Sequence, residues 1–154
     1  MGRCSSIQQE NMNSITALSY MQAASNLERI ADHASRIAEI SSKNECTLNT
    51  EIAEELSKLG PIIVELLEES VSCILQTDPD KANKIIDKAI DIRRRSEEMA
   101  NPANLRNGEK MLVGLVVASS IERMLDYITN LGELAINLFI ANIETEAYQR
   151  SLSS

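Results

Sequence analysis

The apolar residues of this chain recur at the spacing of an α-helix along most of its length. Within residues 14–42 the large apolar side chains follow a period near 3.6 residues: Ile15, Leu18, Met21, Leu27, Ile30, Ile37 and Ile40. No segment alternates apolar and polar residues with the period of two that a half-buried strand requires. Helices are therefore expected at residues 14–42, 50–75, 79–99 and 109–147. Joined by short connections, they predict an all-α fold, an antiparallel bundle of four long helices.

Turn and cap residues mark the boundaries of these helices. Asp78 is expected to cap the third helix, because Pro79 follows it and proline is favoured at the first helical position. Loops are expected at residues 43–49 and in the stretch from Asn101 to Gly108, and a kink or a break is expected at Gly60-Pro61. The predicted organisation is a flexible N-terminus at residues 1–13, a helical domain at 14–148 and a tail at 149–154.

The composition excludes several classes of function. The net charge of −8 disfavours binding to nucleic acid, and the near absence of aromatic residues removes the stacking platforms of single-strand binders. A single histidine excludes sites that need two histidines from one chain. The three cysteines are too few and too widely spaced for a disulfide framework or a cysteine metal knuckle. The expectation is a reduced cytoplasmic protein.

The fourth predicted helix is the most apolar part of the chain. It has hardly any polar stripe between Met111 and Ile143, yet it contains charged residues that make a membrane span unfavourable. We therefore expect no transmembrane segment. The helix should lie at the centre of the bundle or be covered by another subunit, and a homodimer is the simplest such assembly.

A duplicated segment is the most informative feature of the sequence. Residues 24–40 (ASNLERIADHASRIAEI) can be aligned with residues 118–134 (ASSIERMLDYITNLGEL), and Glu-Arg-x-x-Asp recurs in register with a second Glu. Two unrelated amphipathic helices would share the apolar period by chance, but they would rarely share these charged residues as well. The alignment therefore indicates an internal repeat.

Carboxylates stand four residues apart in both copies of the repeat and on the third helix. Such pairs share one helix face about 6 Å apart, where like charges repel. Carboxylates in an apolar setting need a cation, either a hard metal ion or an arginine such as Arg29, Arg93 or Arg123. The pairs on the third and fourth helices should converge, because a short connection makes these helices antiparallel neighbours. The candidate metal ligands are Glu28, Asp32, Asp87, Asp91, Glu122 and Asp126.

These segments resemble a known family. Residues 27–34 (LERIADHA) are similar to the Leu-Glu-Arg-Ile-Gly-Asp-His-Ala signature of PhoU proteins, which regulate phosphate signalling. Residues 87–91 resemble the Asp/Glu-x-x-Ile-Asp element of the preceding helix in that family. Residues 121–126 resemble a more divergent second copy, with Leu125 in place of the signature glycine and Tyr127 in place of its histidine.

The resemblance implies a fold of two three-helix repeats, of which this chain holds one complete repeat plus one extra helix. It also implies that the acidic pairs bind multinuclear iron or zinc clusters, and no other cofactor. From the ligands alone, all-oxygen sets suit magnesium or manganese equally well.

The resemblance further implies a regulator of phosphate uptake and phosphate-starvation signalling, not an enzyme. Its partners would be a phosphate transporter or a sensor-kinase component. The alternative is a metal-free helical oligomerisation or regulatory module of an ion transporter or channel. A carboxylate-bridged di-metal enzyme is disfavoured, because that site needs Glu-x-x-His on two helices and Ile30 stands three residues before His33. No catalytic residue is expected.

Overall fold

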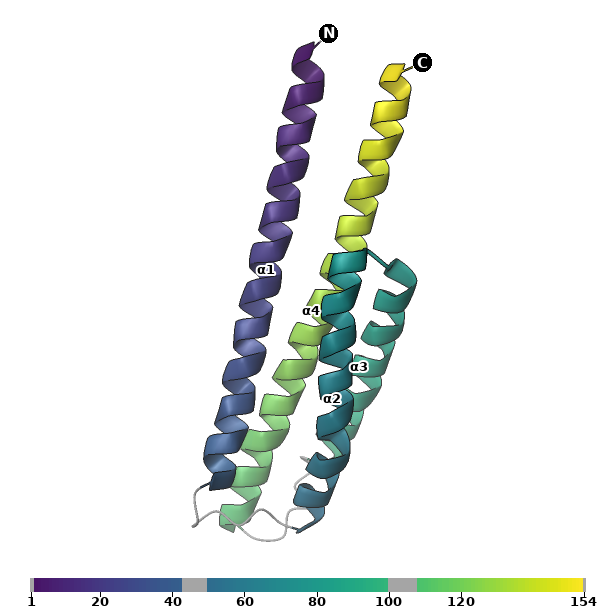
Figure 1. The fold of residues 1–154 in the computed structure, drawn as a ribbon. Helices are drawn as coiled ribbons and strands as arrows, with labels where there is room; N and C mark the ends of the chain where they lie inside the picture. The colour runs from purple at the N-terminus through teal and green to yellow at the C-terminus, as the bar shows by residue number, and fades with distance from the viewer. Residues whose placement is uncertain (1, 43–49, 100–107, 154) are drawn as a thin grey trace.

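Four long helices make up the structure, a computed structural model that describes residues 2–42, 50–99 and 108–153, with side chains over 14–42, 53–98 and 113–151. The helices are α1 (Gly2–Ser42), α2 (Thr50–Gln76), α3 (Pro79–Met99) and α4 (Gly108–Ser153). Successive helices run in opposite directions, and both chain termini lie at the same end of the bundle (Figure 1). The described residues contain no strand, so the all-α antiparallel bundle is confirmed.

The turn between α2 and α3 has the predicted cap. The Lys81 backbone N–H donates to Oδ1 of Asp78 at 3.0 Å, which satisfies one of the free amides in the first turn of α3. The Asp78 N–H donates in turn to the Cys73 carbonyl at 3.4 Å and closes the end of α2. Thr77, between them, has a φ of 50°, the left-handed backbone that reverses the chain direction. The loops expected at 43–49 and 101–107 lie outside the described residues.

Three local expectations differ from the structure. Helix α1 begins at Gly2 instead of residue 14, and α4 continues to Ser153 instead of ending at 147. Both extensions are polar but contain few helix breakers, so propensity carries each helix beyond its apolar stripe. Helix α2 runs through Pro61 without a break. A proline inside a helix removes one backbone donor, and here the packing of Leu59 and Ile63 on the core holds the helix together across it.

Helix α4 is the central element, as its apolar character predicted. It packs against all three other helices, whereas α1 packs mainly on α4. Its buried side chains recur along the full length of the shorter helices: Val117, Ala118, Ile121, Leu125, Ile128, Leu131, Leu134, Ala135 and Leu138. The core of the bundle therefore lies between α4 and the α2–α3 pair.

Beyond the ends of α2 and α3, only α1 and α4 continue, as two antiparallel helices (Figure 1). Large apolar side chains are exposed on these two helices, including Leu18 at 56% and Met21 at 70% on α1, and Ile143 at 49% on α4. In the described part of α1 the buried residues are Ser19, Ala23 and Ile30. Helix α1 therefore lies on the bundle by one narrow stripe and leaves most of its surface to solvent.

Candidate functional site

The two copies of the repeat lie against each other along α1 and α4. The rings of His33 and Tyr127 are 6.0 Å apart between centroids, and the Arg29 guanidinium carbon lies 5.9 Å from the centroid of Tyr127. His33 and Tyr127 occupy the same position in the two aligned copies. Contact between equivalent positions on two antiparallel helices means that a local two-fold axis passes close to this pair. The two copies therefore pack face to face.

His33 contributes to this contact through its ring and not through a hydrogen bond. Its Nδ1 atom is buried and has no hydrogen-bond partner among the described residues. The carboxylates of the first copy, Glu28 and Asp32, lie on the exposed part of α1. In the single chain, the first copy therefore presents its carboxylates to solvent.

The second copy has helix α3 packed on its other side. The Ser96 hydroxyl, fully buried, donates to the Ala118 carbonyl of α4 at 3.4 Å. Further along, Gly132 brings the two helices close together: a Cβ added there would lie 2.9 Å from Cγ1 of Ile86. A glycine is required at this crossing because α3 occupies the space that any side chain would need. These two contacts fix where the polar side chains at the edge of the α3–α4 interface meet.

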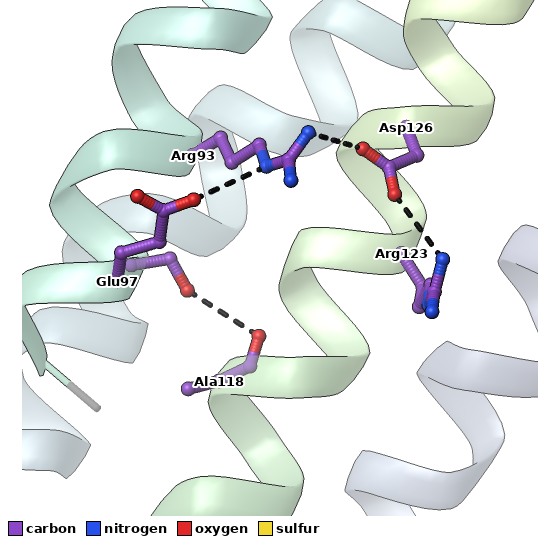
Figure 2. A network of polar contacts seen from close by, with 6 residues as sticks. Arg93, Glu97, Ala118, Arg123 and Asp126 are labelled. Atoms are coloured by element: carbon purple, nitrogen blue, oxygen red, sulfur yellow. Dashed lines mark hydrogen bonds and ion pairs between the residues drawn. The ribbon is translucent and has the colours of Figure 1, made fainter.

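Asp126 is the centre of a network of alternating charges at that edge (Figure 2). Arg93 of α3 donates from Nη1 to Oδ1 of Asp126 at 2.9 Å, and its Nε lies 3.3 Å from Oε1 of Glu97. Arg123 of α4 places Nη1 3.6 Å from Oδ2 of Asp126. The Asp126 side chain is 32% exposed, against 48% for Arg93 and 63% for Arg123. Each oxygen of Asp126 therefore faces one guanidinium group.

The other expected ligands do not join Asp126. Asp87 and Asp91 are exposed on α3, and Asp91 pairs with Arg94 of the same helix at 3.5 Å, with both side chains more than two thirds exposed. Glu122 is half-buried on α4. Among the side chains described here, no group of three or more His, Cys, Asp or Glu is placed to hold a metal ion. The structure therefore does not bring together the four carboxylates expected at this interface, and metal binding stays a prediction.

A hollow of about 500 Å³ lies beside the charged network. Arg93, Arg123, Asp126 and Tyr127 line it, together with apolar residues of α3 and α4. A second hollow, of about 390 Å³, lies between α1 and α4 and is lined mainly by amide side chains: Gln22, Asn26, Asn130 and Asn137. Residues of the duplicated segments line part of both hollows.

The residues that sequence analysis missed are the supports of this network. Glu97 was not singled out, although it stands four residues after Arg93, the spacing of a helix ion pair. Ser96 and Gly132 were also missed. A small residue in each helix of an apolar pair is the signal that could have indicated a close crossing of α3 and α4.

Within the described residues, no helix is long and apolar enough to cross a membrane. Comparison with curated proteins and with solved structures found no match. Comparison with protein-family models matched residues 3–41 and 56–135 to the PhoU domain. The first segment lies within α1, and the second runs from α2 through α3 into the repeat copy on α4. The match spans most of the chain, and the chain belongs to the PhoU domain family.

Proposed function

We propose that this protein is a non-enzymatic regulator of phosphate uptake and phosphate-starvation signalling that acts by contact with other proteins. The observation that carries the proposal is the family match, which includes both copies of the repeat. The partners proposed are a phosphate transporter or a sensor-kinase component, and the protein is proposed to act in the cytoplasm.

The distribution of exposed apolar residues supports a role in protein contacts. Exposed large apolar side chains occur on all four helices, and most of those described belong to α1 and α4: Ile15, Leu18, Tyr20, Met21, Ile140 and Ile143. Large exposed apolar groups on a chain of this charge are typical of surfaces that bind other proteins. The same observation favours the second candidate, a metal-free regulatory module of an ion transporter or channel.

The test is genetic and biochemical. Deletion of the gene is expected to alter phosphate uptake and the expression of a phosphate-starvation reporter, and the full chain supplied in trans should restore both. A variant with Leu18→Glu and Met21→Glu should fail to restore them if this surface is used, whereas Glu54→Gln, an exposed change on α2, should restore them fully. Unchanged phosphate uptake with altered transport of another ion would refute the first candidate and support the second.

Absence of catalysis is tested separately with purified protein. Hydrolysis of phosphate esters or ATP should not exceed that of a mock preparation. Turnover that disappears in Asp126→Asn would contradict the proposal, because a contact-based regulator needs no reacting carboxylate.

A further inference from the structure

The charged network at the α3–α4 edge bears on whether the second copy of the repeat binds a metal ion. The resemblance implies that Glu122 and Asp126 contribute to an iron or zinc cluster. A metal ligand must offer a free lone pair toward the ion, and carboxylate sites for hard cations need several such oxygens around one point. The groups around the Asp126 carboxylate show whether this site fits such an ion.

They do not fit it. Both oxygens of Asp126 face guanidinium groups, Oδ1 toward Arg93 and Oδ2 toward Arg123. A divalent cation placed against this carboxylate would lie within a few ångströms of two positive charges, and it would have to displace at least one of them. Among the described residues, no group of three or more His, Cys, Asp or Glu gathers at Asp126 to offset this repulsion.

The position of Arg93 is set by its surroundings. Its Nε is held by Glu97 one turn later on α3, while its Nη1 reaches Asp126 on α4. The buried hydrogen bond from Ser96 to the Ala118 carbonyl also joins α3 to α4, and Ala118 lies about two turns before Asp126 on α4 (Figure 2). By contrast, the ion pair of the neighbouring Arg94 lies within its own helix, with the exposed Asp91. Arg93 therefore joins two helices, and Arg94 does not.

We propose that Glu97, Arg93, Asp126 and Arg123 form an arginine clasp that links α3 to α4 and takes the place of a metal ion at Asp126. The clasp neutralises Asp126, whose side chain is 32% exposed at the edge of the interface. Arginine suits this role because its planar group donates in several directions at once, here to Glu97 and to Asp126. The inference concerns what holds the two helices together and does not depend on the proposed function.

The first experiment is a double-mutant cycle on the full chain with Arg93→Gln, Asp126→Asn and the double variant. Each single change is expected to lower the melting temperature by about 1–3 °C, in the range of ion pairs at partly exposed sites. The double variant should lose less than the sum of the two, because the pair is already broken in either single variant. Arg94→Gln is the matched control and should leave the melting temperature unchanged. Additive effects, or equal effects of Arg93→Gln and Arg94→Gln, would overturn the clasp.

The second experiment measures metal directly and does not require the variants to be as stable as the parent. Protein purified without chelator is incubated with Fe²⁺, Zn²⁺ or Mn²⁺, desalted and analysed for bound metal. The expected result is no metal that depends on Asp126 and no rise in melting temperature with any of the three ions. Stoichiometric metal in the parent chain that is lost in Asp126→Asn but retained in Glu55→Gln, a remote change on α2, would overturn the proposal. If Asp126→Asn does not fold, the parent chain alone is measured. Stoichiometric metal in the parent chain, whose removal by a chelator lowers the melting temperature, would then overturn the proposal.

Discussion

The close crossing of α3 and α4 at Gly132 gives a prediction whose sign depends on one neighbouring side chain. In Gly132→Ala the new Cβ would lie 2.9 Å from Cγ1 and 3.2 Å from Cδ1 of Ile86, inside normal contact distance. Overpacking of this kind costs about 1–3 kcal/mol. Alanine in place of glycine within a helix gains about 0.8–1.0 kcal/mol. The net expectation is a free energy of unfolding lowered by about 0–2 kcal/mol.

Shortening Ile86 should reverse the sign. Ile86→Ala removes the two nearest atoms that the new Cβ would meet, and the next nearest is the Ala82 carbonyl oxygen at 3.4 Å, an ordinary contact. In that background Gly132→Ala should raise the free energy of unfolding by about 1 kcal/mol, the helix-propensity gain alone. The coupling between the two positions should therefore be about 1–3 kcal/mol.

Urea unfolding followed by far-UV circular dichroism measures these differences as shifts of the midpoint at constant slope. All four proteins are compared at one concentration, because any self-association adds to the apparent stability. The same effect of Gly132→Ala in both backgrounds would refute the reasoning, since Ile86 would then not be the group that limits the space.

Three further outcomes are expected. Asp78→Ala should lower the free energy of unfolding by about 0.5–2 kcal/mol, because the Lys81 N–H loses its cap acceptor. Asp78→Ser should keep most of the parent's free energy of unfolding, because serine can also cap the helix. Equal losses in the two variants would contradict the cap. Burial raises the pKa of the Cys73 thiol above its ordinary value, so the folded state favours the neutral thiol. The stability that this thiol contributes is therefore complete below the unfolded-state pKa and is lost as pH rises toward the raised value; a Cys73→Ala variant that shows the same alkaline loss would contradict this. Sedimentation should show a homo-oligomer, most simply a dimer, that Leu18→Glu weakens, whereas a parent chain that stays monomeric at high concentration would contradict the expectation.

Much of the fold was predictable because its signals are local. The 3.6-residue apolar period identifies all four helices, and Asp78-Pro79 identifies the start of α3 to the residue. The even apolar character of the last helix predicted its central position, which the structure confirms. The ends of α1 and α4 were placed too far inward, because polar residues with good helix propensity carry no periodic signal.

The charged site was harder to predict because it depends on the relative rotation of two helices. Spacing placed Asp87 and Asp91 on one face of α3, but it did not say that this face would point to solvent. Of the three arginines considered as partners of the carboxylates, Arg93 and Arg123 both face Asp126, and the crossing of α3 with α4 is what brings Arg93 there. The Glu97 contact then follows from helix spacing alone.

The contact between His33 and Tyr127 bears on which helices of this protein pair with each other. A residue on a two-fold axis meets its own equivalent. If the two copies of the repeat were identical, histidine would therefore meet histidine, and the first copy of another molecule could provide the same contact. Because tyrosine stands on one side of this contact, the α1 and α4 surfaces differ here, and the contact joins two unlike residues. Pairing of α1 with a second α1 would place two histidines together, and pairing of α4 with a second α4 would place two tyrosines together. The unlike residues at this position therefore favour pairing of an α1 with an α4 over pairing of either helix with its own copy.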